Sequence, residues 1–146
     1  MRIEVTSEVF HPWQLLESYQ REQTALAGKY GATAAFVGSM RDFNEGDDVA
    51  EMHLEHYPGM TETFLRELAE QSLKQWSLLD VLIVHRVGTV RPNDTIVLVA
   101  VWSAHRASAF EACRNIMEQL KSQAPFWKKE TLGSGDTRWV EKNTPG

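Results

Sequence analysis

The chain has 146 residues and a formal net charge of −5 at pH 7, with 42% hydrophobic and 24% charged residues. These values are ordinary for a soluble globular protein, and the length suits one domain, residues 1–146, around a single core. The acidic balance argues against a general nucleic-acid binder, which needs a basic stripe to displace counterions, but it leaves room for a local basic pocket.

The cysteine count and the N-terminus indicate the compartment. Cys113 is the single cysteine, so no intrachain disulfide can form, as is usual in a reducing compartment. Residues 1–5 lack the apolar stretch that is typical of a signal peptide. The longest apolar run, residues 96–102, is far too short to span a membrane. We therefore expect a soluble, cytoplasmic protein.

The first third of the chain is predicted to form a strand, a helix, a second strand and a loop. Ile3 and Val5 alternate with polar residues, as in a short strand. Pro12 stands where helices often begin, and apolar residues follow it at helical spacing. Residues 32–37 are typical of a buried strand, whereas residues 42–48 are predicted to be a polar loop.

The middle of the chain is predicted to hold three strands and a helix. Residues 51–56 alternate between apolar and polar side chains, which is the period of a half-buried strand. The helix after Pro58-Gly59 carries its apolar residues on one face: Phe64, Leu65, Leu68, Ala69 and Trp76. Residues 81–87 are predicted to form a strand, residues 88–94 a turn region, and residues 95–102 a central strand buried on both faces.

A second long helix is predicted to follow. Ser103 is the expected N-cap of a helix that starts near His105, and Pro125 disfavours helical geometry at Ala124, where the helix should end. The helix is expected to bury a stripe with steps of three and four residues: Phe110, Cys113, Met117, Leu120 and Ala124.

The chain is predicted to close with a hairpin. Residues 126–132 and 137–141 look like two strands that are joined by a glycine-containing turn. Strands and helices are mixed along the chain without internal repeats, so we expect an α+β domain with a mostly antiparallel sheet.

Two lysines flank the Pro125 break and are candidates for amine chemistry. Lys121 lies at the predicted helix end and Lys128 in the following strand, with apolar Phe126 and Trp127 between them. Amines beside apolar surface can have a pKa low enough for base or nucleophile chemistry. The alternative is an ordinary helix C-terminus followed by a solvated hairpin, and the residues alone leave both interpretations open.

Two further segments are candidates for anion binding. His105 and Arg106 stand at a predicted helix N-terminus, where unpaired N–H groups and the helix dipole favour a phosphate or carboxylate. Arg41 follows a buried strand and a glycine that permits close backbone approach. The alternatives are a surface arginine beside a structural histidine, and a plain turn.

Other reactive residue types are predicted to be structural. His53, His56 and His85 do not have the spacing of a metal site, so no metal is expected. Cys113 lies on an apolar stripe and is more typical of a core residue than of a nucleophile. The sequence contains no Ser/His/Asp or phosphate-loop signature.

Five ordered motifs nevertheless carry a resemblance to a known family. They are FVGSMR at residues 36–41, LEHYPGM at 54–60, HRVG at 85–88, SAHR with AFE at 103–111, and LK with APFWKKE at 120–130. With them the chain closely resembles the MoaE family, the large catalytic subunits of molybdopterin synthase, from about Ala32 to Glu141. The segment up to Gly31 and the tail after Glu141 add nothing to the resemblance.

The resemblance implies a function, a fold and partners. It implies a sulfurtransferase of molybdenum cofactor biosynthesis that converts cyclic pyranopterin monophosphate (precursor Z) to molybdopterin and needs no cofactor. The two sulfurs come from a thiocarboxylate on the C-terminal glycine of a small ubiquitin-like subunit, whose tail enters the large subunit. The implied assembly is a heterotetramer built on a homodimer of large subunits, and the implied fold is an α/β hammerhead.

The resemblance also assigns residues. It implies that Lys121 and Lys128 are catalytic. The residues that it implies in substrate binding are Ser39, Met40, Arg41, His105, Arg106, Lys129, Glu130 and Arg138. His105 and Arg106 are thereby expected to face Arg41 across one cleft. A pocket of cations in an acidic protein suits an anionic pterin.

Two other functions compete with this one. A non-catalytic module would bind a ubiquitin-like tail or a phosphorylated ligand through the same residues. A phosphate-ester hydrolase is disfavoured, because the sequence offers neither a metal set nor a nucleophile–base pair.

Overall fold

The structure is a computed structural model that describes residues 1–140. Glu141, which the sequence placed at the end of the last strand, lies outside the described residues. The first of two sheets has its strands in the order β1 (Arg2–Thr6), β5 (Asp80–Arg86), β7 (Thr95–Ser103) and β2 (Ala32–Ser39). The β1–β5 pair is parallel and the other two pairs are antiparallel, so β7 is central and β2 forms one edge.

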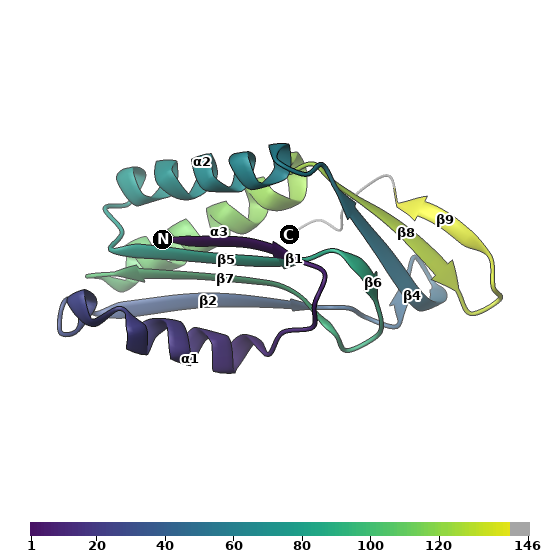
Figure 1. The fold of residues 1–146 in the computed structure, drawn as a ribbon, viewed down its shortest axis with the longest axis horizontal. Coiled ribbons are helices and arrows are strands. Elements are labelled where there is room, and N and C mark those ends of the chain that lie inside the picture. The colour runs from purple at the N-terminus through teal and green to yellow at the C-terminus, as the bar shows by residue number, and fades with distance from the viewer. Residues whose placement is uncertain (141–146) are drawn as a thin grey trace.

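Helices cover both faces of this sheet (Figure 1). One face packs against α2 (Met60–Gln75) and α3 (Arg106–Gln123), and the other packs against α1 (Pro12–Glu22), which a short 3₁₀ turn at Thr24–Leu26 follows. The central strand β7 is buried along eight of its nine residues, as its continuous apolar run predicts. The core therefore lies between β5 and β7 and the three helices.

A second sheet lies at one end of the first (Figure 1). It joins β3 (Phe43–Asn44), β4 (Asp47–His56), β8 (Phe126–Leu132) and β9 (Thr137–Val140) in that order, and β6 (Gly88–Val90) also pairs with β4. All of its recorded pairs are antiparallel. The predicted α+β class, the mostly antiparallel pairing and the C-terminal hairpin are confirmed.

Two segments that were predicted to be loops contain short strands. Residues 42–48 form a hairpin in which Glu45 and Gly46 have φ values of 52° and 81°. Positive φ at both central residues is the geometry of a tight two-residue hairpin turn. Within residues 88–94, three residues form β6. Strands of two or three residues are too short to show alternation, and only their tertiary partners define them.

The N-terminal half of α3 also differs from the prediction. Ser103 belongs to β7, and its hydroxyl accepts a hydrogen bond from the His105 N–H at 3.3 Å, while His105 itself occupies the N-cap position. Phe110 is 68% exposed rather than buried. Cys113, Met117 and Leu120 are buried as predicted, and Ala109, Ala112 and Ile116 are buried with them. In the N-terminal half the buried face thus carries the small residues Ala109 and Ala112, which let α3 approach the sheet closely, rather than Phe110.

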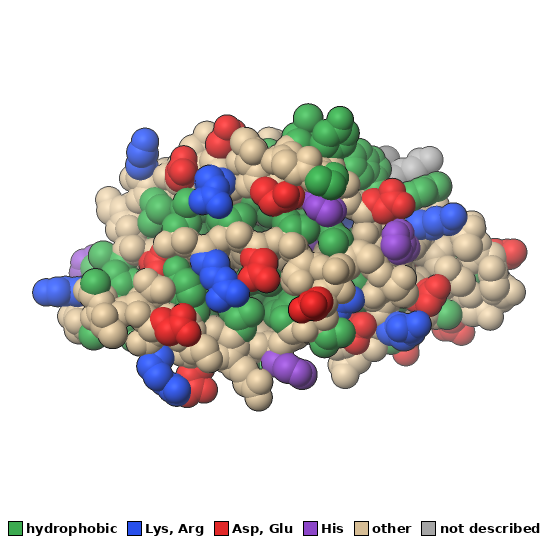
Figure 2. Space-filling model, in the orientation of Figure 1, with side chains coloured by type: hydrophobic (Ala, Val, Ile, Leu, Met, Phe, Trp, Pro, Cys, Tyr) green, Lys and Arg blue, Asp and Glu red, His purple; other side chains and the backbone are tan. Residues whose placement is uncertain are grey.

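The end of α3 agrees with the prediction. Ala124 is the C-cap with extended geometry, as the following Pro125 requires. Within residues 1–140, no helix is long and apolar enough to cross a membrane. Charges of both signs are interspersed over the face shown in Figure 2, without a basic stripe of the kind that nucleic-acid binding needs.

Candidate active site

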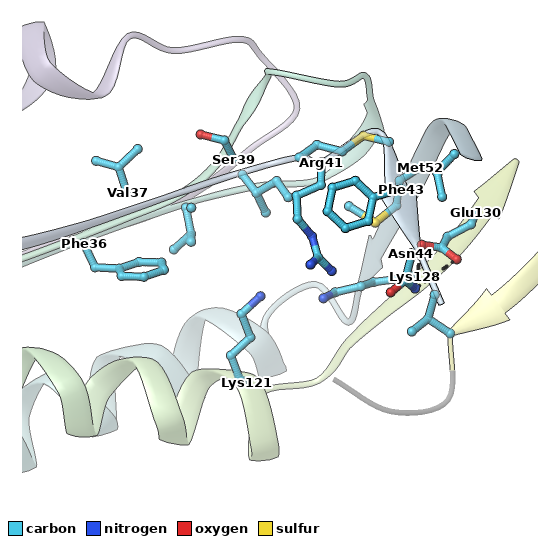
Figure 3. Close-up of a pocket in the computed structure, with 16 residues that line it drawn as sticks. Phe36, Val37, Ser39, Arg41, Phe43, Asn44, Met52, Lys121, Lys128 and Glu130 are labelled. Carbon is cyan, nitrogen blue, oxygen red and sulfur yellow. Dashed lines mark hydrogen bonds between the residues drawn. The ribbon is translucent and has the colours of Figure 1, made fainter. Parts of the chain in front are cut away.

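The Pro125 break brings the two candidate lysines together. Lys121 lies in the last turn of α3 and Lys128 in β8. Between them the helix changes to a strand within a few residues, where the Phe126 N–H donates to the Ala124 carbonyl at 2.8 Å. Both side chains are half-buried, and Figure 3 shows their amines pointing toward one another from different elements.

The environment of this pair lowers the pKa of both amines. Burial is the largest cause for Lys121 and for Lys128. The positive charge of Lys121 and its hydrogen bond with Lys128 add to burial and lower the pKa of Lys128 to about 8. Arg41 lowers both pKa values further, whereas the carboxylate of Glu130 opposes the shift at Lys128. The Lys128 amine can thus exchange a proton near neutral pH.

A pocket of about 330 Å³ opens on one side of the pair (Figure 3). Its walls come from β2, the β3–β4 hairpin, β4 and β8, and they include Phe36 and Phe43. The Arg41 guanidinium lies over the Phe43 ring, 4.9 Å from its centroid, and points into the pocket toward the lysines. Three cationic groups and two aromatic side chains therefore surround one cavity, a combination suited to a flat anionic ligand.

A second pocket, of about 440 Å³, opens on the other side of the same lysines. Its lining is mostly apolar and comprises His85, Leu120, Lys121, Ala124, Phe126, Trp127, Lys128, Trp139 and Val140. Because the two pockets share Lys121 and Lys128, the amine pair stands where they meet. Molecules that enter from the two sides would meet at these amines.

An ion-pair network braces the wall of the first pocket. Glu130, only 5% exposed, accepts from the Arg138 Nε at 2.9 Å and from the Asn44 amide at 3.0 Å. The remaining Arg138 nitrogens donate to Asp47 at 2.9 Å and to the Asn44 carbonyl at 3.0 Å. The network thus ties the β3–β4 hairpin to β8 and β9, and it holds a carboxylate beside Lys128.

Comparisons with known proteins decide the family. Residues 5–123 match the family model described as MoaE protein. The chain belongs to the MoaE family. It is 45% identical over 141 residues to the molybdopterin synthase catalytic subunit of Pseudomonas aeruginosa, a match that covers 97% of this chain and 91% of that protein. The catalytic subunit of Ralstonia nicotianae is 56% identical over 111 residues, which are 76% of this chain but only 62% of that protein.

Solved MoaE structures share the fold. The MoaE protein of Burkholderia ambifaria is 43% identical with a TM-score of 0.78, and the match covers 99% of this chain and 92% of that one. The molybdopterin synthase structure from Staphylococcus aureus gives a TM-score of 0.82 at 28% identity, covering 94% of this chain and 96% of that one. The α/β hammerhead that the resemblance implies agrees with the two-sheet α+β architecture of this MoaE chain.

Four of the predicted substrate-binding residues lie in the wall of the first pocket: Ser39, Met40, Arg41 and Glu130. Arg41 points into it, while Met40 is 6% exposed and packs in the core beneath it. Ser39 also lines the pocket, but its hydroxyl lies on the far side of β2 from Lys121 (Figure 3).

The structure places Lys129 and Arg138 differently from these residues. Lys129 projects from the opposite face of β8 to Lys128, with its amine 5.7 Å from the centroid of the Trp139 ring. Arg138 is engaged in the Glu130 network, and the described lining of neither pocket includes it or Lys129. In this chain Arg138 therefore acts as a brace.

His105 and Arg106 are far from the amine pair within one chain. Both are exposed at the start of α3, whereas Lys121 lies 15 residues further along the same helix. At 1.5 Å per residue the separation is roughly 22 Å. The cleft expected between them and Arg41 is therefore not formed within residues 1–140 of a single copy.

Three residues of these pockets were not identified from the sequence. Phe43 and Asn44 fell in the predicted loop, where a lone aromatic residue among polar neighbours was the available signal. His85 was interpreted as a structural histidine, yet it lines the second pocket. Its position in the HRVG motif gave no chemical reason to select it.

Proposed function

We propose that this chain is the catalytic subunit of molybdopterin synthase, a sulfurtransferase of molybdenum cofactor biosynthesis. It converts cyclic pyranopterin monophosphate to molybdopterin, with two sulfurs that a small ubiquitin-like subunit delivers as C-terminal thiocarboxylates. The observation that carries the proposal is the pair of partly buried amines, Lys121 and Lys128, at the meeting point of two pockets. A cytoplasmic location belongs to the same proposal.

The first pocket is the proposed pterin site. A cyclic phosphate needs cationic donors, and Arg41, Lys121 and Lys128 converge there. A pterin ring needs flat apolar contacts, which Phe36 and Phe43 offer at the pocket wall. Glu130 adds an acceptor for the ring N–H groups while it is itself held by Arg138.

The second pocket is the proposed tail site. An extended chain end with small residues fits a slot lined by Leu120, Phe126, Trp127 and other apolar side chains. Its thiocarboxylate would then meet the amine pair from the side opposite to the pterin. Cys113, the single cysteine, is buried, and burial raises the pKa of its thiol to about 11. A buried thiol of this kind is a poor sulfur donor, which favours sulfur from a partner.

The amines have complementary roles in this proposal. The thiocarboxylate sulfur forms a C–S bond to a side-chain carbon of the pterin while a C–O bond at that carbon breaks and the leaving oxygen takes a proton. Water then cleaves the acyl–sulfur bond, which leaves the sulfur on the pterin and releases the carrier with a plain carboxylate. Lys128, with its pKa near 8, takes and returns protons during these steps. Lys121, whose lowered pKa is partly restored by its hydrogen bond with Lys128, stabilises the negative charge on the acyl group. A second loaded carrier supplies the second sulfur.

We propose that a second copy delivers His105 and Arg106. The strand β2 is an edge of the first sheet, and its sequence, ATAAFVGS, contains no charge or proline to discourage pairing. Because α3 runs in the same direction as β2, antiparallel pairing of two β2 edges sets the start of one α3 beside the end of the other. A homodimer of this kind places the second copy's His105 and Arg106 beside Lys121 and Arg41.

The test is reconstitution with a thiocarboxylated small subunit and precursor Z, with the dithiolene product as the readout. Lys121→Ala and Lys128→Ala are expected to fold normally, to bind the carrier and to lose product by orders of magnitude. Near-normal product from the double variant would refute the catalytic assignment. A wild-type protein that binds the carrier but makes no product would instead be the non-catalytic binding module.

The delivery of Arg106 in trans has its own test. Lys121→Ala and Arg106→Ala chains are each expected to be inactive, but mixed dimers contain one site with both wild-type residues. Co-expression of the two variants should therefore recover a measurable part of the activity. Mixed dimers that stay as inactive as either parent would contradict the arrangement.

A further inference from the structure

His85 is a buried histidine in the wall of the proposed tail pocket. It lies near the end of β5, is 3% exposed and lines the second pocket together with both lysines. Its ring stacks on Phe126, with centroids 3.9 Å apart and planes 16° from parallel. The orientation of the imidazole is therefore fixed by its neighbours.

The hydrogen bonding of His85 determines which ring nitrogen is an acceptor. Its Nδ1 lies 2.7 Å from the backbone carbonyl of Arg86. A carbonyl oxygen only accepts, so Nδ1 carries the hydrogen, and in the neutral ring Nε2 is left with a free lone pair. Burial is the largest influence on this ring, and with the charges of Lys121, Lys128 and His56 it lowers the pKa of His85 to about 3. The imidazole is therefore neutral at physiological pH.

The other polar side chains of this pocket are donors. Lys121 and Lys128 present amines, and Trp127 and Trp139 present indole N–H groups. Apart from the amine pair, whose members bond to each other, His85 thus contributes the one neutral side-chain acceptor among the described residues that line the pocket. A peptide tail brings both kinds of group, because its end is anionic and its backbone N–H groups are donors. An N–H buried without an acceptor is costly.

We propose that His85 recognises the carrier's tail, with Nε2 accepting a hydrogen bond from one of the last two peptide N–H groups. This inference rests on the proposed function, in which the same tail ends at the amine pair. The lysines bind the anionic end and His85 binds the adjacent backbone, so the pocket selects a free peptide N–H at a fixed distance from the terminus. A tail with proline or an N-alkylated residue at the position of this N–H should therefore bind more weakly.

The test is a double-mutant cycle on binding rather than on turnover. Semisynthetic small subunits ending in a plain carboxylate are prepared unmodified, or with N–CH₃ in place of the last or of the second-last peptide N–H. One of the two methylations should weaken binding to the wild-type chain about tenfold, as expected for the loss of one net hydrogen bond to a buried acceptor. In His85→Phe, which keeps the stacking on Phe126, the same methylation should cost less than twofold.

Two variants separate recognition from folding. The thermal midpoint of His85→Phe is measured beside that of His85→Gln, whose amide oxygen restores an acceptor and should restore part of the methylation penalty. Equal penalties in the wild-type chain and in His85→Phe would overturn the proposal, as would a wild-type chain that tolerates both methylated carriers. If His85→Phe does not fold, His85→Gln supplies the cycle: a methylation penalty smaller than that of the wild-type chain supports the proposal, and an unchanged penalty overturns it.

The outcome can be separated from that of the proposed function. Carrier binding that shows no coupling to His85, together with loss of product in Lys121→Ala, would remove only the recognition role. Failure of the wild-type chain to bind any carrier would remove both proposals.

Discussion

The reaction should depend on the protonation of Lys128, and this dependence should shift when Glu130 is neutralised. The pKa of Lys128 is lowered to about 8, chiefly by burial and then by Lys121, while Glu130 opposes the shift. A group with a pKa of 8 is neutral in about one molecule in ten at pH 7 and about nine in ten at pH 9. If the neutral amine is the base, the single-turnover rate should rise about tenfold between these pH values.

The variant Glu130→Gln tests the cause of this dependence. The amide keeps the shape of Glu130 and can still accept from Arg138, but it removes the negative charge that raises the pKa of Lys128. The midpoint of the pH profile should therefore move to lower pH, and the rate at pH 7 should increase wherever binding is saturated. Rapid-quench measurement of product between pH 6 and 9.5, with preloaded carrier and saturating precursor, gives both midpoints.

Two results would refute this reasoning. A rate that is flat between pH 7 and 9 would show that no amine with a lowered pKa takes part in the limiting step. A midpoint that moves upward in Glu130→Gln would show that the carboxylate does not act on Lys128 through its charge. Measurement of substrate affinity at each pH keeps weaker binding of the anionic pterin from being mistaken for either result.

The remaining predictions concern the residues around the pair. Lys129→Met should retain product formation within twofold, because Lys129 lies on the outer face of β8, whereas the matched change Lys128→Met should abolish it in the same assay. Arg138→Met should lower the free energy of unfolding by about 1–3 kcal/mol in denaturant titrations and raise KM for the pterin more than it lowers kcat, since it releases the β3–β4 hairpin. Phe110→Glu, at a side chain 68% exposed on the Lys121 side of α3, should leave the thermal midpoint unchanged but convert dimers to monomers in light scattering. The control Trp13→Glu, on α1, should stay dimeric.

Periodicity was sufficient to predict the long elements but not the short ones. The buried strand β7, the helix α2 and the stop at Ala124 follow from local patterns of apolar residues and from Pro125. The strands β3 and β6 do not, since each consists of two or three residues stabilised by pairing with β4. A short stretch of sequence does not show which distant strand it pairs with, so its local pattern predicts a loop at β3 and at β6.

The site was predictable only in part, for a comparable reason. Residue type and spacing indicated that Lys121 and Lys128 could act as bases or nucleophiles. The engagement of Arg138 by Glu130 depends on the pairing of β8 with β9, which places these two residues opposite each other. The acceptor role of His85 depends on its contact with the Arg86 carbonyl, which spacing does not reveal. Residue types thus indicated which side chains could exchange protons or bind anions. Tertiary contacts decided which of those side chains face a cavity.

The seven-residue spacing of Lys121 and Lys128 explains why the pair requires the break at Pro125. On one continuous helix, residues seven apart share a face but stand roughly 10.5 Å apart along the axis. On one strand they would be roughly 23 Å apart and on opposite faces. A helix end followed at once by a strand avoids both separations. The bend between them is held from α2, because the Thr61 hydroxyl donates to the Pro125 carbonyl at 3.1 Å. The effect of Lys121 in lowering the pKa of Lys128 therefore originates in the change from helix to strand at Pro125. A change that extends the helix through this point should separate the amines before it unfolds the domain.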